Sequence, residues 1–189
     1  MKGSGVRLYM GLVHYPVYNK RFQTIASAIT TLDLHDLARI GRTYDVRTFF
    51  AITPLEDQQV LARRVLAHWV QGPGGRYNPD RKEALGRVRV VSSLQDARDA
   101  IQKAECQHPI LVGTDACRRD GGSMAYEEGR TLIRRDGPVL LLFGTAWGLH
   151  REVLDLIDHV LDPISGPTAY NHLPVRAAAA IVLDRLVGR

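Results

Sequence analysis

The sequence of 189 residues is poor in cysteine and has no long apolar run. Its two cysteines, Cys106 and Cys117, do not make a disulfide framework, and no CxxC or Cys/His cluster has metal-ligand spacing. We therefore expect reduced thiols, no bound metal and a cytoplasmic protein. Apolar runs such as Leu8–Val13 and Val139–Phe143 are far too short to span a membrane, and no small-residue cleavage pattern follows the first. No membrane contact is expected.

Two common nucleotide-binding motifs are also missing. Gly144 and Gly148 bracket Thr145, Ala146 and Trp147, but no Gly-Lys-Ser/Thr follows, so this turn is not a P-loop. The G-x-G-x-x-G spacing of dinucleotide-binding folds is absent, and the turn lies near the end of the chain. Taken alone, FGTAWG is typical of a tight strand-to-helix turn with its tryptophan in the core. Glycines at these positions would equally let a ligand approach the backbone.

Composition and charge favour one globular domain, residues 1–189, with a polyanionic partner. Hydrophobic residues make up 45% and charged residues 24%, which is ordinary for a folded domain. The net charge of +5 favours a polyanionic partner, and a mildly basic enzyme without nucleic acid is the alternative. Arginine forks suit phosphate contacts. The basic residues gather at Arg39–Arg47, Arg63–Arg64, Arg76–Arg89 and Arg118–Arg119.

Strand and helix signals alternate along the chain. The predicted strands are 8–13, 46–52, 87–91, 109–112, 139–143 and 159–161, and the predicted helices are 25–41, 55–71, one from 93, 126–135, 149–157 and 173–186. Segments 14–22 and 72–85 are predicted as loops, the second because of its glycine and proline content. This alternation predicts an α/β fold with a mainly parallel sheet and helices on both faces.

The last quarter of the chain combines a strand end, a polar joint and an alanine-rich helix. The joint, Leu161–His172, contains Pro163, Gly166 and Pro167, which exclude regular structure there. Pro174 suits the first turn of the helix, with Asn171 or His172 as its cap. Four consecutive alanines, 177–180, let another backbone pack closely. The alternative is an ordinary C-terminal docking helix.

The order and spacing of these pieces resemble the cofactor end of the SPOUT RNA methyltransferases. In that family the C-terminal chain forms a deep trefoil knot around S-adenosylmethionine, and the resemblance implies both here. Three loops would hold the cofactor through backbone groups, with the preceding strand end as the floor. The implied cofactor-binding residues are Val112, Gly113, Thr114, Gly144, Thr145, Trp147, Gly148, Leu161, Pro163, Ile164, Tyr170, His172 and Leu173.

A second resemblance covers nearly the whole chain. The segments HYPVYNK, HDLAR, YNP.RKEAL, FGTAWGL and YNHL.VR are similar to a stand-alone bacterial SPOUT family related to the tRNA (guanine-N1)-methyltransferases. It implies a homodimer that methylates RNA, either tRNA or rRNA, without a metal. Whether the target is a base nitrogen or a ribose 2'-oxygen stays open. A knotted protein that binds RNA or the cofactor without catalysis is one alternative, and an unrelated doubly wound nucleotide enzyme is another.

Three residues are candidates for catalysis. The segment Leu32–Val46 resembles the first motif of the ribose 2'-O-methyltransferases, which places Asp33 where that motif has Asn and Arg39 at the catalytic Arg. In the third motif Pro174 stands in place of Asn, and Asn171 is a nearby substitute. Asp115 follows a predicted strand, where a carboxylate could take a proton from a nitrogen nucleophile. A solvated loop is the alternative for Asp115.

Two segments are candidates for contact with RNA. The first follows strand 8–13 at the ligand edge, and the second places an aromatic ring among basic side chains, as base-stacking sites do. Their candidate residues are His14, Asn19, Lys20, Arg76, Tyr77, Arg81 and Lys82. The alternative for each segment is an ordinary surface loop.

Overall fold

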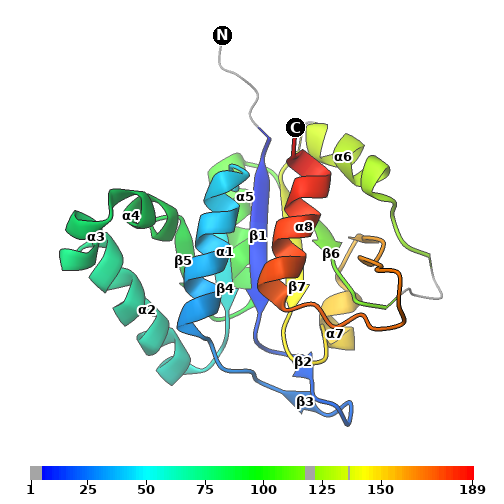
Figure 1. The fold of residues 1–189 in the computed structure, drawn as a ribbon, viewed down its shortest axis with the longest axis horizontal. Coiled ribbons are helices and arrows are strands. Elements are labelled where there is room, and N and C mark those ends of the chain that lie inside the picture. The colour runs from blue at the N-terminus through cyan, green and yellow to red at the C-terminus, as the bar shows by residue number, and fades with distance from the viewer. Residues whose placement is uncertain (1–5, 118–121, 136) are drawn as a thin grey trace.

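The computed structural model describes residues 6–117, 122–135 and 137–189 (Figure 1). Arg118 and Arg119 lie outside the described residues. Six parallel strands form one sheet in the order β5-β4-β1-β7-β6-β8. Their bounds are β1 Leu8–Val13, β4 Phe49–Ile52, β5 Val88–Val91, β6 Ile110–Gly113, β7 Val139–Gly144 and β8 His159–Val160. The prediction of a mainly parallel sheet is confirmed.

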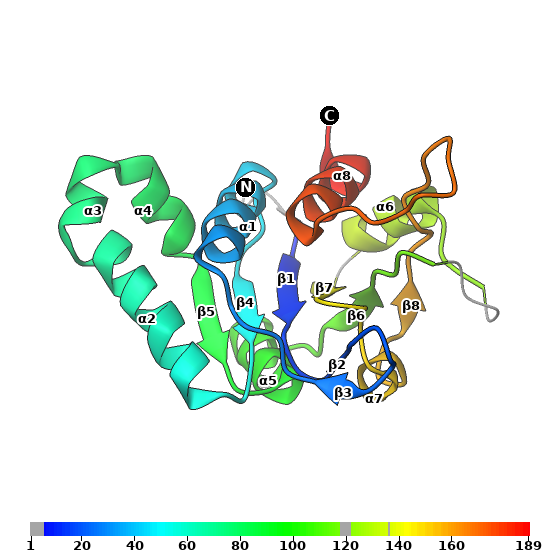
Figure 2. The same cartoon turned by 60° about the horizontal axis from the view of Figure 1, so that its bottom comes forward.

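Helices cover both faces of this sheet (Figure 2). One face carries α1 Thr31–Thr43, α2 Glu56–Val70, α4 Pro79–Leu85, α6 Tyr126–Arg134 and α8 Val175–Val187. The other carries α5 Leu94–Glu105 and α7 Arg151–Leu154, and α3 Pro73–Tyr77 joins α2 to α4. Helix α8 lies between α1 and α6 in both views. Among the described residues, no helix is both long and apolar enough to cross a membrane.

The central strands are apolar throughout because helices cover them on both sides. All six residues of β1 and all four of β4 are buried. Side chains alternate between the layers: Met10 and Leu12 pack under α1 and α8, whereas Tyr9 and Val13 pack on the side of α5 and α7. The same alternation in β7 places Leu141 in the first layer. The sheet thus divides two apolar clusters.

The start of α1 differs from the prediction. We expected a helix from residue 25, but α1 begins at Thr31 and the segment before it is extended. Thr30 is the N-cap, and its hydroxyl accepts a hydrogen bond from the backbone N of Asp33 at 3.0 Å. A threonine cap of this kind satisfies one of the free N–H groups of the first turn. Residues 26–30 are therefore not helical. They place Ser27 beside the end of β1, where the backbone N of Ser27 donates to the His14 carbonyl.

Both predicted loops contain secondary structure. In the first, β2 Val17–Tyr18 begins an antiparallel hairpin completed by β3 Thr24–Ile25. The prediction of a loop over residues 72–85 is wrong, because α3 and α4 fill it. Pro73 and Pro79 stand at the first turns of these helices, where proline is tolerated, and Asn78 Oδ1 accepts from the N of Arg81.

Candidate functional site

The carboxyl ends of four neighbouring strands meet at the lower edge of the sheet in Figure 1. Val13 of β1 pairs with Gly144 of β7, and Gly113 of β6 pairs with both Leu142 and Val160. The loops that follow β6, β7 and β8 are therefore adjacent in space. Ligands of open parallel sheets bind outside this edge. The structure brings together the loops that the sequence assigned to the cofactor.

Two glycines shape the loop after β7 in different ways. A Cβ atom on Gly144 would lie 2.7 Å from the backbone N of Leu149, so only glycine lets the loop fold back on itself. Gly148 has a φ of +100°, and a Cβ there would meet no atom within 4 Å. Gly148 therefore combines a left-handed backbone with open space beside it. Trp147 between them is 58% exposed, so the interpretation of a buried core tryptophan is wrong.

This loop, 144–149, is held by the segment that follows β1. The N of Trp147 donates to the Tyr18 carbonyl at 2.9 Å, and the N of Tyr18 donates to the Gly148 carbonyl at 3.2 Å. Thr145 Oγ1 donates to the Val13 carbonyl at 3.0 Å and lies 2.6 Å from Ser27 Oγ. The loop is thus fixed at both ends. No motif in the sequence indicated a role for Ser27.

The predicted floor is built of core residues. Val112 of the floor is almost completely buried, and so is Leu161, which was assigned to the cofactor loops. Thr114 uses its backbone N and its hydroxyl for the same acceptor, the Leu142 carbonyl, at 3.0 Å each. The N of Leu161 donates to the Gly113 carbonyl at 2.9 Å. These residues would therefore contact a ligand mainly through backbone atoms and would give the site a rigid floor.

The joint before α8 returns to the loop after β6. Asn171 Nδ2 donates to the Ala116 carbonyl at 2.5 Å. Tyr170 is exposed and meets His172 edge to face, with ring centroids 5.2 Å apart, and Leu173 is also exposed. A cavity of about 630 Å³ opens here, lined by Ala116, Tyr126, Asp162, Pro163, Ser165, Asn171 and Arg185. Two predicted site residues, Pro163 and Asn171, thus line the same cavity. Arg185 also lines it but was not among the predicted site residues.

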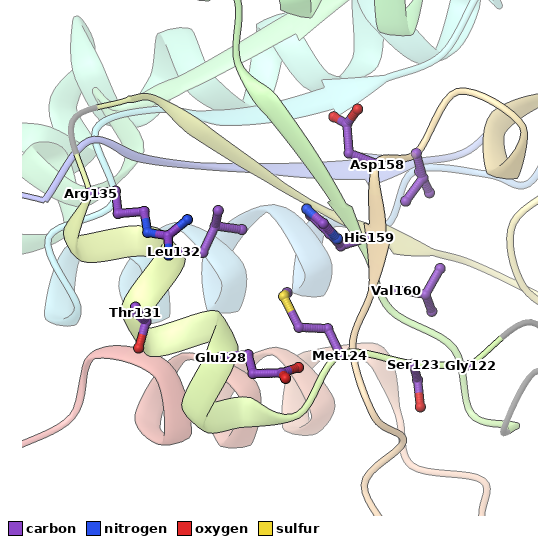
Figure 3. A pocket seen from close by; sticks show the side chains of 11 residues that line it. Gly122, Ser123, Met124, Glu128, Thr131, Leu132, Arg135, Asp158, His159 and Val160 are labelled. Carbon is purple, nitrogen blue, oxygen red and sulfur yellow. The ribbon is translucent and has the colours of Figure 1, made fainter.

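A larger cavity, about 740 Å³, lies between α6 and β8 (Figure 3). Leu132 of α6 and His159 of β8 point toward it, as do Met124 just before α6 and Arg135 at its C-terminal end. It contains none of the residues predicted for cofactor, catalysis or RNA. We therefore place the candidate site at the three loops and not in this cavity. Among the described residues, no group of three or more His, Cys, Asp or Glu side chains is arranged to hold a metal ion.

The starts of α1 and α8 are joined by a charge pair between buried Asp33 and half-buried Arg176. Both oxygens of Asp33 are used: Oδ2 accepts from the Thr30 hydroxyl at 2.6 Å, and Oδ1 accepts from Arg176 Nη1 at 3.0 Å. Arg176 Nε also lies 3.1 Å from Asp36 Oδ2. Arg176 belongs to the YNHL.VR segment, but the sequence did not suggest this role. The pair fixes the N-terminal end of α8 beside the site.

Arg39 lies on a different side of α1. It is exposed and shares a helical stripe with His35 and Arg42, and that stripe faces α2 and α4. His35 meets Trp69 edge to face at 5.2 Å, and Arg42 Nε lies 2.6 Å from Glu83 Oε1. Burial lowers the pKa of His35, and the charge of Arg81 lowers it further. Within one chain, Arg39 is therefore not brought together with the cofactor loops.

Asp115 lies at the predicted edge, directly after β6. Its Oδ1 accepts a hydrogen bond from the N of Cys117 at 3.0 Å, which closes a short turn. The residue is half-buried. Nearby, burial raises the pKa of Tyr126, against the lowering influence of Arg185, so this phenol stays protonated at neutral pH.

The residues predicted to contact RNA occupy very different places. His14 is fully buried, so its ring is not at the surface. Asn19 closes the β2–β3 turn, with Oδ1 accepting from the backbone N of Arg21 and Gln23, and Lys20 is exposed at the tip.

The second group surrounds α3 and α4. Tyr77 is 89% exposed, and Arg76 and Lys82 are also exposed. The guanidinium of Arg81 instead lies over the Trp69 ring, 4.8 Å from its centroid, and is half-buried. Three of these four side chains are thus open to a partner.

Residues 7–188 match the family described as SAM-dependent RNA methyltransferases. The chain belongs to this family. It is 45% identical over 184 residues to a tRNA (guanine-N(1)-)-methyltransferase of Oleidesulfovibrio alaskensis, a match that covers 97% of this chain and 43% of the relative. The chain thus spans less than half the length of that relative. A protein of Aquifex aeolicus is 36% identical over 183 residues, which cover 96% of this chain and 89% of the relative.

The solved structure of TrmJ from Z. mobilis ZM4 has a similar fold. It superposes with a TM-score of 0.60 at 18% identity, covering 95% of this chain and 67% of that one. The family match confirms the predicted RNA methyltransferase, with S-adenosylmethionine as the cofactor of the family, and the solved structure shows a shared fold. The alternative of an unrelated nucleotide enzyme is excluded.

Proposed function

We propose that this methyltransferase modifies a nucleotide of tRNA or rRNA and holds its cofactor at the carboxyl ends of β6, β7 and β8. The observation that carries the proposal is the loop 144–149. At Gly148 the backbone is left-handed and a side chain would project into open space. Exposed Trp147, Tyr170 and Leu173 stand around the same three loops. Open backbone flanked by exposed apolar groups suits a purine and a thioether, so these residues fit the cofactor.

The chain's own residues have separate tasks in this proposal. The loops at Gly144–Gly148, Pro163-Ile164 and His172-Leu173 bind the cofactor, which supplies an electrophilic methyl group when bound. The acceptor nucleotide must lie in line with that methyl group, and positioning of this kind can supply much of the rate enhancement. We assign the acceptor's proton to the Asp115 carboxylate, and the orientation of the acceptor to Asn171. Asp115 lies in the loop after β6, and Asn171 contacts the next residue of that loop, Ala116.

The site supports a base nitrogen as the target more than a ribose oxygen. Asp33 stands where the ribose enzymes have Asn, and both of its oxygens are already used by Thr30 and Arg176. Its role here is therefore structural. The relative of Oleidesulfovibrio alaskensis is a tRNA (guanine-N(1)-)-methyltransferase by name, which supports the same choice. Exposed Lys20, Arg76 and Lys82 would contact RNA phosphates, with Tyr77 as a stacking surface.

A deep trefoil knot around the cofactor is the second part of the proposal. The segment before α6 runs beside the end of β8: the N of Met124 donates to the Val160 carbonyl, and the N of Asp162 donates to the Met124 carbonyl. The later joint is tied to the loop after β6 through Asn171 and Ala116. The chain then enters α8 between α1 and α6 (Figure 2). Knots are very rare, so this part rests on the family together with these contacts.

The third part is a homodimer with a shared site. Leu32 at the start of α1 is exposed, as are Trp147 and Leu173 near the loops. Exposed apolar groups at one edge favour a protein partner. Arg39 lies apart from the cofactor loops of its own chain, so a second copy would supply it to the site. In this arrangement the three cofactor loops of one subunit, here called the cradle, form a site together with Arg39 of the partner subunit.

Methyl transfer to RNA tests the proposal. Purified protein would be incubated with labelled S-adenosylmethionine and total RNA from cells that lack it, followed by nucleoside mass spectrometry. We expect label in RNA and one new methylated base. Label on a ribose would contradict the choice of target. Cofactor binding without any transfer, with RNA from such cells, would favour the non-catalytic binding protein instead.

A further inference from the structure

His14 occupies a buried position between the cofactor loop and the start of α1. It directly follows β1, and its side chain and backbone are completely shielded from solvent. Its N donates to the Ile52 carbonyl at 2.9 Å, and its carbonyl accepts from the N of Ser27 at 2.8 Å. The ring Nδ1 lies 2.9 Å from Ser27 Oγ. The two backbone hydrogen bonds fix the main chain of His14, and the contact with Ser27 Oγ orients its ring.

The hydrogen-bond chain from His14 has only one consistent direction. It runs from Nδ1 to Ser27 Oγ, from there to Thr145 Oγ1, and ends at the Val13 carbonyl. A carbonyl can only accept, so Thr145 gives its single proton to Val13. Ser27 must then donate to Thr145 over 2.6 Å, and Ser27 must accept from His14. Nδ1 therefore carries a proton.

The second ring nitrogen is buried without a partner. Nε2 has no hydrogen bond within the described part of the chain. Burial lowers the pKa of His14 to about 4, while the Asp33 carboxylate and the Ala28 backbone raise it. At neutral pH the ring is therefore uncharged, protonated on Nδ1 and unprotonated on Nε2. In the opposite tautomer Ser27 would donate to Nδ1. No proton would then lie between Ser27 Oγ and Thr145 Oγ1, unless Thr145 gave up its hydrogen bond to the Val13 carbonyl.

We propose that His14 is a positioning residue of this methyltransferase, which fixes the cofactor loop through Ser27 and Thr145 by holding its proton on Nδ1. The inference rests on the proposed function, because it assigns the loop 144–149 to the cofactor. His14 touches neither cofactor nor RNA in this account. It sets the direction of the hydroxyl chain, and the chain sets the place of Thr145 next to Gly144. Ser27, which the sequence did not suggest, becomes the connecting residue.

Two amide substitutions, each of which keeps one of the two nitrogen positions of the ring, separate this role from simple packing. The amide nitrogen of His14→Asn stands where Nδ1 stands and can donate to Ser27, whereas the amide of His14→Gln reaches toward the Nε2 position. We expect His14→Asn to keep the affinity for S-adenosylhomocysteine within about threefold and His14→Gln to lose about tenfold, the effect of one or two hydrogen bonds. Ser27→Ala should resemble His14→Gln. His108→Asn, at an exposed position, is the control.

The tautomer can be measured directly in the wild-type protein. Nitrogen-15 correlation spectra distinguish Nδ1–H from Nε2–H, and this readout needs no cofactor. We expect Nδ1–H at pH 7. An Nε2–H tautomer, or equal affinities of His14→Gln and wild type, would overturn the proposal. Failure of the wild type to bind S-adenosylhomocysteine, with the Nδ1–H tautomer present, would instead contradict the proposed function.

Discussion

Arg176 Nη1 lies 3.0 Å from Asp33 Oδ1, which joins the first turn of α8 to the first turn of α1. The two residues are 143 positions apart in the sequence. Helix α8 begins at Val175, two residues after Leu173, the last of the proposed cofactor residues. The ion pair therefore positions one wall of the proposed site, and without Arg176 the buried Asp33 carboxylate would lose its ion-pair partner and keep the Thr30 hydroxyl.

Arg176→Ala is expected to lower the free energy of unfolding by about 1–3 kcal/mol, the cost of a buried acceptor that loses its partner. It should also weaken binding of S-adenosylhomocysteine. Arg151→Ala is the matched control, because Arg151 pairs with Asp155 on an exposed surface. Its effect should stay below about 1 kcal/mol. Urea unfolding and calorimetry measure both quantities, and equal effects of the two substitutions would contradict the assignment.

Gly148→Ala should weaken cofactor binding strongly, since its φ of +100° disfavours any side chain and the open space beside it would be filled. The backbone strain should cost roughly 1–3 kcal/mol of stability. Gly166→Ala is the control: it also has no atom within 4 Å of a Cβ but lacks a positive φ. Affinity of Gly148→Ala equal to that of the wild type, measured by calorimetry, would show that the cradle is misplaced.

Ala179→Leu should overpack the region where α8 packs against α1, α6 and β7. Ala179 is completely buried, and extra methyl groups in a filled core cost about 1–3 kcal/mol. Cofactor affinity should fall as well, because the same helix begins at the site. Ala67→Leu, on the exposed surface of α2, should leave both quantities unchanged. If Ala179→Leu were tolerated in urea unfolding, close packing of a threaded helix would be contradicted.

Stability should fall as the pH drops from about 6.5 to 4 because of His14. Its pKa is lowered to about 4 in the folded protein, so below 6.5 the unfolded chain binds a proton that the folded chain does not. Stability from this group is complete above 6.5 and is lost on acidification, by up to roughly 3 kcal/mol. His14→Asn should show a flatter dependence in urea unfolding at several pH values. Identical slopes would rule out this source.

Arg39→Ala and Gly148→Ala should complement each other if the site is shared between subunits. Each variant alone should be inactive in methyl transfer, and Arg39→Ala should still bind S-adenosylhomocysteine. A mixed dimer contains one site with an intact cradle and Arg39 of the partner subunit. Co-expression should therefore restore activity, whereas a site made within one chain would stay inactive in the mixture.

The sheet and most helices could be predicted because hydrophobic periodicity records burial directly. The miss at residues 72–85 has a physical reason: Gly74 and Gly75 suggested a loop, but they are buried where α3 meets Trp69. A Cβ on Gly75 would lie 2.3 Å from the Trp69 carbonyl oxygen, so glycine is required there by packing. The early start assigned to α1 overlooked a readable signal, the Thr30 cap followed by Asp33 three residues later.

The place of the candidate site could be proposed from the sequence where strands end in glycine, but single side chains that act at long range could not be identified. Ser27 and Arg176 carry no local signal, since their partners Thr145 and Asp33 lie more than one hundred positions away. His14 was correctly placed at the carboxyl end of β1, but its side chain was expected at the surface. Its burial depends on the extended segment before α1, which the predicted longer helix would not have placed there.

Calorimetric titration with S-adenosylhomocysteine tests the central claim most directly, because it asks whether the three loops form a cofactor site. We predict saturable binding of one molecule per chain, loss of that binding in Gly148→Ala, and no comparable binding of NAD or ATP. Failure of the folded wild-type protein to bind, or binding that survives unchanged in Gly148→Ala, would contradict the account.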